Sequence, residues 1–317
     1  MTETTAEVIT SRQNPRVLAL ARLRERAGRR EQGRFLIEGA RELSRALAAS
    51  VSAGTAGAAG AGAGSTAGGH PAVAVREVFH CPALFKDAAG ATRVLNAARA
   101  AGASLVELGE SAFGKVSGRE GADGLLGVAD TWDVSLAALG EIAPSALLLV
   151  VEAVEKPGNL GALFRTADSA GCAALLVADA VADIFNPNVV RASQGALFSM
   201  PCAVAPAVEI AAFLARWGGR VFAAAPAARR RYWDADFRGG AAVLLGGEKD
   251  GLSPLWLGAG GDDASTGGAT GGAAAGVRVE PVSIPQAGLS DSLNVGVAGA
   301  VLLFEAVRQR ATTGGVR

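Results

Sequence analysis

The stretch SALLLVVEAVEKPGNLGALFRTADSAG, residues 145–171, decides the fold class of this chain. Its first part is an apolar run, which is typical of a strand buried on both faces of a sheet. A turn at Pro157-Gly158 follows, and Asn159 is placed to cap a helix. Apolar residues then recur at helical spacing, at Leu160, Leu163, Phe164 and Ala167. A buried strand that leads into a helix predicts a parallel α/β sheet when the unit repeats.

The alternation of strand and helix continues through the C-terminal half. Further strands are expected in AALLVAD, PCAVA, RVFAAA, AAVLLGGE and VRVEPVSIP, with helices between most of them. A long final helix is expected in SLNVGVAGAVLLFEAVRQR, residues 292–310, and its apolar residues cover more than one face. Such a helix packs on its own sheet and against a partner, or is fully buried in a monomer. Ligands of such sheets bind beyond the carboxyl ends of the strands.

The N-terminal part predicts a smaller α/β unit. Asn14-Pro15 opens a helix that carries Val17, Leu18 and Ala21 on one side, with Leu23 as a candidate fourth member. A strand in FLIEG and a helix in ARELSRALA follow. Strands in VREVFHC and ASLVEL then enclose a helix in ATRVLNAARAAG, and a strand in GLLGVAD completes the unit.

Two domains are therefore expected, over residues 1–130 and 143–317. Tracts rich in glycine and alanine interrupt them at 50–70 and 258–276, and we expect both to be flexible insertions.

Composition excludes several classes of function. Lysine plus arginine and aspartate plus glutamate both number 30, so net charge neither supports nor excludes a nucleic-acid partner. Three cysteines far apart in sequence argue against a disulfide framework or a zinc site, and we expect no metal. Only His70 and His80 could serve a Ser-His-Asp triad, which argues against that chemistry. No targeting or membrane segment is recognisable, so a cytoplasmic protein is expected.

Three C-terminal segments carry residues suited to a ligand site. In the first, EKPGNLGALFRTADSAG at residues 155–171, Arg165 lies at the edge of the helix's apolar stripe, where it can reach over the strand ends; the alternative is a surface arginine. In VLLGGEKDGLS, residues 243–253, the glycines allow backbone to approach a ligand and Glu248 follows the strand, although an ordinary turn has the same pattern. In the third segment, SIPQAGLSDSLNVGVAGAVLLFEAVRQR at residues 283–310, Ser292 or Asp291 is expected to cap the final helix, with Asn294 in its first turn.

Together, these segments closely resemble the three signature motifs of the SpoU/TrmH family of SPOUT methyltransferases, over residues 145–310. The motif N-x-G-x-x-x-R is present as Asn159, Gly161 and Arg165, G-x-E as Gly246 and Glu248, and S-L-N-V as Ser292 to Val295. Residues 10–45 also resemble the small RNA-binding domain, similar to ribosomal protein L30e, of many members. Gly296 stands where the family commonly has serine, which puts only one side-chain hydrogen bond in doubt.

The resemblance implies a parallel-sheet catalytic domain with a C-terminal trefoil knot, preceded by an L30e-like α/β domain. It also implies S-adenosylmethionine as cofactor and a homodimer formed through the final helix. Its cofactor-binding residues would be Gly246, Ile284 and Leu293. Its catalytic residues would be Arg165, Asn159, Glu248, Ser292 and Asn294. Residues 10–45 hold ten arginines against four acids, and the candidate RNA-binding residues are Arg12, Asn14, Arg22, Arg29, Arg30 and Arg34; the alternative is a solvated helix face.

The expected reaction is methyl transfer to a ribose 2′-hydroxyl, with 23S ribosomal RNA favoured by the L30e-like segment. Transfer RNA is the alternative substrate. A thiostrepton-resistance type enzyme, which also modifies the large-subunit ribosomal RNA, is an alternative kind of family member. A non-catalytic RNA-binding or ribosome-assembly factor is the alternative from another class. The absent G-x-G-x-x-G fingerprint argues against a nicotinamide-dependent oxidoreductase.

Overall fold

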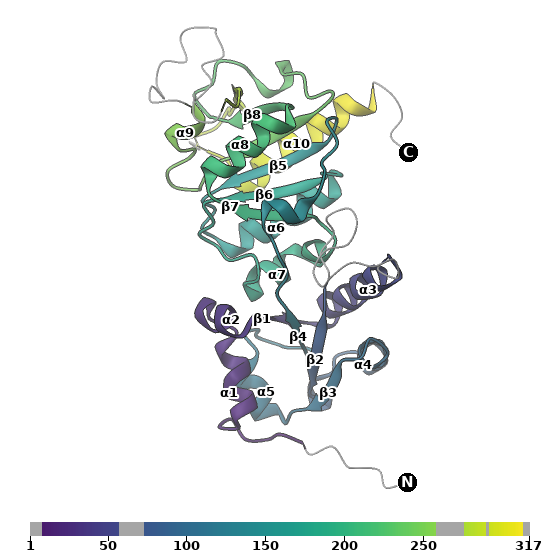
Figure 1. The fold of residues 1–317 in the computed structure, drawn as a ribbon. Helices are drawn as coiled ribbons and strands as arrows, with labels where there is room; N and C mark the ends of the chain where they lie inside the picture. The colour runs from purple at the N-terminus through teal and green to yellow at the C-terminus, as the bar shows by residue number, and fades with distance from the viewer. Residues whose placement is uncertain (1–7, 57–72, 258–275, 290–291, 313–317) are drawn as a thin grey trace. The chain divides into compact units, whose positions relative to one another are not determined.

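A computed structural model describes residues 8–56, 73–257, 276–289 and 292–312. The chain forms two compact units (Figure 1). The first comprises Met1–Asp133 together with Asp183–Ser199, and the second comprises Val134–Ala182 and Met200–Arg317. The second expected domain, 143–317, thus contributes one internal segment to the first unit.

The first unit contains a four-stranded mixed sheet of order β1-β4-β2-β3. Strands β1 and β2 run antiparallel to β4, whereas β2 and β3 are parallel. The strands are β1 (Arg34–Glu38), β2 (Val75–His80), β3 (Ser104–Glu107) and β4 (Leu125–Asp130). The helices are α1 (Pro15–Arg22), α2 (Arg26–Gln32), α3 (Ala40–Ala56), α4 (Ala88–Ala100), α5 (Glu110–Val116) and α7 (Pro187–Ser193). The helices and strands expected here from the sequence are confirmed, and α2, α5 and the position of α7 are additions.

Helix α1 begins as expected, because the Asn14 side chain accepts a hydrogen bond from the Arg16 backbone N–H at 2.9 Å. Its buried stripe differs from the expected one. Leu20 and Leu23 join Val17 in the core, whereas Leu18 is exposed. The buried residues Val17, Leu20 and Leu23 are three apart, so they lie on one side of the helix, whereas Leu18 lies on another. The tract expected at 50–70 begins within α3, and its residues 57–70 lie outside the described residues.

The second unit is built on a six-stranded parallel sheet of order β10-β8-β9-β5-β6-β7. Its central strands are buried at every position, as the apolar runs predict. The strands are β5 (Leu147–Glu152), β6 (Ala174–Ala178), β7 (Cys202–Ala205), β8 (Arg220–Ala224), β9 (Ala241–Leu245) and β10 (Val279–Val282). The helices are α6 (Pro157–Ser169), α8 (Ala207–Trp217), α9 (Pro254–Leu257) and α10 (Val295–Ala311). The tract expected at 258–276 lies outside the described residues except for Gly276.

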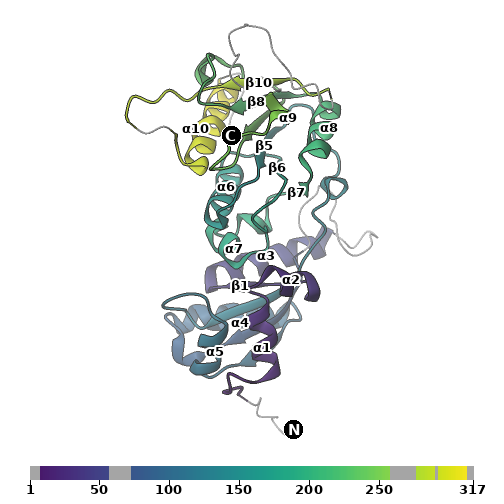
Figure 2. The same cartoon turned by 90° about the vertical axis from the view of Figure 1, so that its left-hand side faces the viewer.

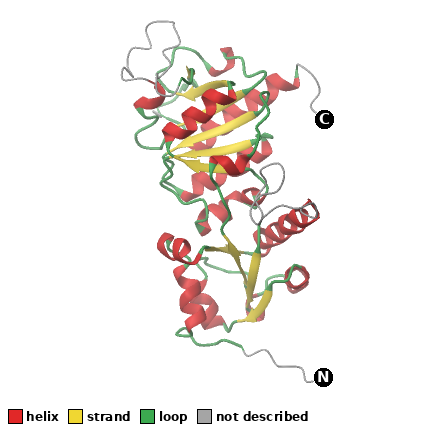
Figure 3. Ribbon diagram, in the orientation of Figure 1, coloured by secondary structure: helices red, strands yellow, loops and turns green. Residues whose placement is uncertain are grey.

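Helices cover both faces of this sheet, with α6 and α10 on one face and α8 and α9 on the other (Figure 2). Leu148 and Val150 of β5 share a core with Ile210 of α8 and Trp256 of α9. On the opposite face, Gly299 of α10 lies so close to α6 and β9 that an added Cβ would stand 2.9 Å from Leu163 and Leu245. The helical and strand layers are distinguished by colour in Figure 3. Among the described residues, no helix is long and apolar enough to cross a membrane.

Candidate active site

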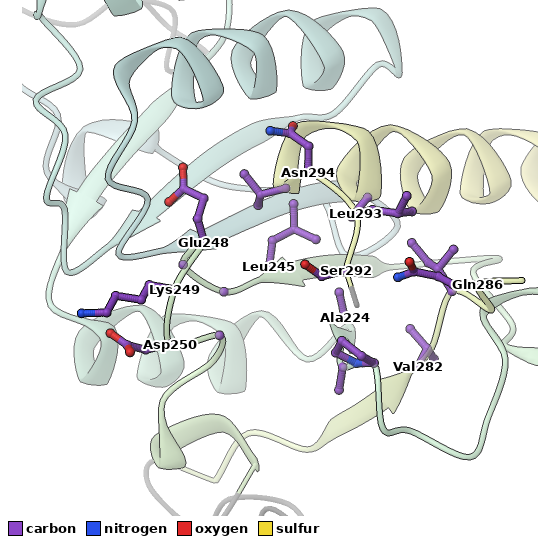
Figure 4. Close-up of a pocket in the computed structure, with 18 of the residues that line it drawn as sticks. Ala224, Leu245, Glu248, Lys249, Asp250, Val282, Gln286, Ser292, Leu293 and Asn294 are labelled. Atoms are coloured by element: carbon purple, nitrogen blue, oxygen red, sulfur yellow. The ribbon is translucent and has the colours of Figure 1, made fainter. Parts of the chain in front are cut away.

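A cavity of about 470 Å³ lies at the carboxyl ends of three neighbouring strands, beyond Ala224 of β8, Leu245 of β9 and Val282 of β10 (Figure 4). This is the edge at which parallel α/β sheets bind ligands. Six of the eight residues expected to serve the cofactor or the catalytic step line it: Gly246, Glu248, Ile284, Ser292, Leu293 and Asn294. Lining residues that the sequence did not single out include Lys156, Lys249, Asp250 and Gln286.

The glycine at the end of β9 is required by a close backbone approach. A Cβ on Gly246 would lie 2.2 Å from the carbonyl carbon of Gly251 and 2.4 Å from the Leu252 nitrogen. The neighbouring Gly247 and Gly251 exchange two backbone hydrogen bonds, at 3.0 and 3.2 Å, which close a tight loop over the cavity. A side chain at position 246 therefore cannot be placed without opening this loop, which agrees with the expected use of glycine backbone in the cavity wall.

Three side chains from the three segments form one hydrogen-bonded series. The Asn159 amide nitrogen donates to Glu248 Oε1 at 2.7 Å, and Asn294 Nδ2 donates to Asn159 Oδ1 at 3.1 Å. An ionised carboxylate only accepts hydrogen bonds, so Glu248 fixes which end of the Asn159 amide faces it. The other end is left to accept from Asn294. The first, second and third segments are thereby joined through Asn159.

Backbone donors complete the environment of Glu248. Its carboxylate accepts from the Glu155 N–H at 3.0 Å and from the Lys156 N–H at 3.4 Å, both just before α6. Burial alone raises the pKa of the Glu248 carboxyl, but the hydrogen bonds from Glu155, Asn159 and Lys156 outweigh it and hold the pKa below its usual value. Glu248 is therefore a fixed negative group rather than a proton donor near neutral pH.

Two capping predictions were wrong. Asn159 does not cap α6, because Lys156 is the N-cap residue and Asn159 lies inside the first turn, with its side chain directed to Glu248. The N-cap of α10 is Asn294, whose Oδ1 accepts from the Gly296 N–H at 2.9 Å, and not Ser292. Asp291 lies outside the described residues. Both asparagines hydrogen-bond across the site, and partners distant in sequence decide their roles.

A buried carboxylate that the sequence analysis missed holds the glycine loop to the sheet. Glu152, at the end of β5, is only 2% exposed. It accepts from the Ser253 N–H at 2.8 Å, the Ser253 hydroxyl at 2.7 Å and the Trp256 indole N–H at 2.9 Å. The acid interrupts an otherwise apolar run, which is the signal that could have identified it, since a buried carboxylate needs such donors.

Arg165 is exposed on α6 and is not among the residues that line the cavity. Ala162, one turn before it, lies 3.8 Å from the position of a Cβ on Gly296 in the first turn of α10. Among the described residues, no hydrogen bond or ion pair holds the Arg165 side chain, which is exposed.

The expected RNA-binding residues of the first unit are not equally accessible. Arg12 and Arg30 are exposed, Arg22 pairs with Glu31, and Arg34 pairs with Glu77 and Asp130. Asn14 is occupied in capping α1.

The assignment of Arg29 to RNA binding is corrected. Its side chain is 3% exposed, and its Nε donates to Asp183 Oδ2 at 2.7 Å. Its Nη1 donates to the carbonyl oxygens of Leu23 and Arg24. A buried guanidinium that is fully engaged by protein acceptors stabilises the first unit and cannot reach a phosphate.

The fold and this geometry can be set beside known proteins. The chain matches the SpoU rRNA Methylase family over residues 146–260 and the MRM3-like substrate binding domain over 14–61. It is 32% identical to the 23S rRNA (guanosine-2'-O-)-methyltransferase RlmB of Ralstonia nicotianae, over 68% of this chain and 82% of that protein. The chain belongs to the SpoU rRNA methylase family. Within this family, the expectation of an RNA 2′-O-ribose methyltransferase that uses S-adenosylmethionine is confirmed.

Solved structures share this fold over nearly the whole chain. A crystal structure described as an RNA 2'-O ribose methyltransferase is 34% identical, with a TM-score of 0.72, and the match covers 96% of this chain and 99% of that one. An AdoMet-bound rRNA methyltransferase from Sinorhizobium meliloti, 24% identical, has a TM-score of 0.71 over 95% and 97% of the two chains. This second likeness shows the fold alone. The expected SPOUT α/β fold class is confirmed.

Proposed function

We propose that this chain transfers a methyl group from S-adenosylmethionine to a ribose 2′-hydroxyl of 23S ribosomal RNA. The observation that carries the proposal is the series Glu248–Asn159–Asn294 beside the glycine-walled cavity. The series joins the three segments at the sheet edge where a cofactor and a nucleotide must meet.

The cavity fits the cofactor. Its volume of about 470 Å³ lies within the usual range for small-molecule sites, roughly 300–1,000 Å³. The wall at Gly246 is backbone without a side chain, so the adenine and ribose can approach it closely. Ile284 and Leu293 supply apolar surface from the two other segments. When bound, S-adenosylmethionine supplies an activated methyl group on a sulfonium.

The chain's own residues would then position and activate the ribose. A 2′-hydroxyl is a poor nucleophile near neutral pH, and it must be held in line with the methyl carbon, about 3–3.5 Å away. The carbon–sulfur bond breaks as the oxygen–carbon bond forms, its electron pair stays on sulfur, and the hydroxyl proton leaves to solvent. Arg165 would stabilise the developing negative charge on the oxygen or bind the adjacent phosphate. A guanidinium offers only N–H donors and has no acceptor for a proton, so a role as general base is disfavoured.

The remaining catalytic residues would order the site. Glu248 and Asn294 hold the Asn159 amide from both ends, and Ser292 lies in the cavity wall before α10. We propose that this arrangement fixes the start of α6, from which Arg165 projects two turns later. The exposed arginines Arg12 and Arg30 of the first unit would bind phosphates of the RNA.

We also propose a homodimer formed through α10, as the resemblance implies. One face of this helix is buried in the unit, at Leu302, Leu303 and Ala306. The opposite face leaves Val297 and Phe304 about half exposed, at 49% and 48%, with Leu293 at 37% just before the helix. Apolar side chains in a row on one exposed helix face support a protein contact. The trefoil knot and a cytoplasmic site of action remain parts of the same proposal.

The decisive experiment is a comparison of ribosomal RNA from cells with and without the gene. Mapping of 2′-O-methylated positions should show one 23S position that loses its methyl group in the deletion strain. Purified protein and labelled S-adenosylmethionine should restore it in vitro. A lost methyl group on transfer RNA would overturn the substrate assignment, and cofactor binding without transfer to any RNA would indicate a binding or assembly factor.

A further inference from the structure

A basic and aromatic loop lies next to the cofactor cavity. The segment Arg229-Arg230-Arg231-Tyr232-Trp233 follows β8, and all three arginines are exposed. Trp233 is 44% exposed, and the Arg231 guanidinium lies over its ring, 5.6 Å from the centroid. Tyr232 meets the same indole edge-on, with ring centroids 4.9 Å apart. A large indole left in solvent is unusual in a loop that the core does not need.

Hydrogen bonds fix this loop to the strand end that carries Ile284. The Ser283 N–H donates to the Arg230 carbonyl at 2.8 Å, and the Tyr232 N–H donates to the Ser283 carbonyl at 2.9 Å. Arg230 is further held by an ion pair of 2.7 Å with Glu280 of β10. The backbone of the loop is therefore positioned, and Arg230 has a structural role, whereas Arg229, Arg231 and Trp233 present their side chains at the surface.

A second hollow, of about 400 Å³, lies between this loop and the cavity. Arg229, Arg231, Ser283 and Pro285 line it, and it shares Pro226, Ile284 and Gln286 with the lining of the cofactor cavity. A group held in the hollow would thus be a direct neighbour of a molecule in the cavity. Two guanidinium groups in one wall favour an anion, because each offers several N–H donors to phosphate oxygens.

We infer that this hollow and Trp233 form a binding site for the single-stranded RNA that flanks the methylated nucleotide. Arg229 and Arg231 bind a phosphodiester group, and the Trp233 indole stacks with a base. The inference rests on the proposed function, since it takes RNA as the ligand. Aromatic rings that stack with bases beside a cationic groove are the usual means of holding single strands. Arginine can stack on an indole while its N–H groups still contact a phosphate, so the Arg231–Trp233 pair suits this use.

The charge of the loop favours RNA over a second protein surface. Three consecutive arginines are opposed nearby by Asp234 and Glu280, and the second of these acids is already paired with Arg230. The apolar stripe proposed for the dimer lies on α10, and that stripe carries no arginine between Val297 and Phe304.

The test measures RNA binding and turnover in two full-length variants, Trp233→Phe and the double variant Arg229→Ala/Arg231→Ala. Arg216→Ala, an exposed arginine on α8, and Val208→Ala, an exposed apolar residue on the same helix, are matched controls. The binding probe is an oligouridylate of about eight nucleotides, followed by tryptophan fluorescence. In the wild type, stacking on Trp233 should quench the emission, and Trp233→Phe should lose most of that quench.

In the double variant, the KM for the RNA substrate should be roughly 5- to 100-fold higher than in the wild type. The dissociation constant for S-adenosylmethionine should stay within about twofold of the wild-type value. The slope of log affinity against log salt should fall by roughly 0.7, since one phosphate contact to a single strand accounts for about that much. Both control variants should behave as the wild type.

Three results would overturn the inference. The first is unchanged quench and RNA affinity in both variants while the wild type methylates RNA. The second is weakened S-adenosylmethionine binding with normal RNA affinity, which would make the hollow part of the cofactor site. The third is a shift from dimer to monomer with normal RNA affinity, which would make the loop a contact between copies. If the wild type methylates no RNA at all, the proposed function fails, and the quench with oligouridylate still decides whether the surface binds RNA.

Discussion

The Asn159 amide nitrogen lies 2.7 Å from Glu248 Oε1, and 89 residues of chain separate the two partners. The contact joins the first turn of α6 to the glycine loop after β9. Asn294 then completes the series by donating to the other end of the same amide, at 3.1 Å. The Asn159 amide thus links all three segments, and its loss should disturb the position of all three.

Replacement of Glu248 and Asn294 should therefore give non-additive effects on methyl transfer. Each of Glu248→Ala and Asn294→Ala releases one end of Asn159, and we expect each to lower kcat about 10- to 100-fold. The double variant should be less impaired than the product of the two, with a coupling energy of about 0.5–3 kcal/mol. Single-turnover rates with saturating cofactor measure this. Strict additivity would show that Glu248 and Asn294 act independently of Asn159.

Glu248 also gives a prediction for the pH dependence of stability. Its pKa is lower in the folded chain than the usual 4.5, so folding favours the ionised form. The stabilisation is fully present above about pH 4.5 and is lost as the pH falls through the lower folded pKa. Glu248→Gln removes the titrating group, so the difference in unfolding free energy between wild type and variant should shrink from about pH 4.5 downwards. Denaturant melts at several pH values test this, and a constant difference would exclude the mechanism.

The sequence predicted the strands well, because β5, β6 and β9 are buried on both faces and read as apolar runs. It also predicted six residues that line the cavity, through the resemblance to a family. What it missed depends on partners far along the chain. Asn159 is of a residue type that often caps helices, but its side chain hydrogen-bonds Glu248. Arg29 is of a residue type that often binds phosphate, but its side chain is buried against Asp183. Local spacing carries no information on such contacts.

Gly246→Ala should disrupt the cofactor cavity. The added methyl group would stand 2.2 Å from backbone of Gly251, so the loop that forms one wall of the cavity has to shift. Affinity for S-adenosylmethionine should fall at least about 100-fold by calorimetry, with a loss of stability of about 1–3 kcal/mol. Gly114→Ala is the matched control, because an added Cβ there meets nothing within 4 Å, and it should leave cofactor affinity unchanged. A wild-type affinity for S-adenosylmethionine in Gly246→Ala would contradict the assignment of the Gly246 backbone to the wall of the cofactor cavity.

Removal of the buried Glu152 carboxylate at the end of β5 should loosen the attachment of the glycine loop after β9 to the sheet. Glu152→Ala leaves the donors of Ser253 and Trp256 without their acceptor, and each orphaned buried donor costs about 1–3 kcal/mol. We expect a drop of several kcal/mol in unfolding free energy and weaker cofactor binding. Ser253→Ala removes only the hydroxyl donor and leaves the Ser253 N–H and the Trp256 indole N–H to Glu152, so it should cost less. An unfolding free energy equal to that of the wild type in Glu152→Ala would refute the anchoring role.

The exposed face of α10 predicts the oligomeric state. Phe304→Asp places a charge in the apolar stripe, and a dimer that buries this stripe should dissociate, because an unpaired carboxylate is costly to bury. Sedimentation velocity should show a dimer for the wild type and a monomer for the variant. Val208→Asp on α8, where the side chain is 55% exposed, is the matched control and should sediment as the wild type does. A Phe304→Asp dimer, or a wild-type monomer, would show that the stripe is covered in some other way.

Arg165→Ala should separate methyl transfer from cofactor binding. The side chain is exposed and outside the cavity lining, so its removal should leave the melting temperature unchanged. The affinity for S-adenosylmethionine should stay within a few-fold of the wild type. Loss of one electrostatic stabiliser of a developing oxyanion typically lowers kcat about 100- to 1,000-fold. Arg165→Lys keeps the charge but not the planar donor fork, and should recover only part of the rate. Persistent full activity in Arg165→Ala would transfer the role to another cation near the site, of which Lys156 is the first to test, since it lies in the cavity wall.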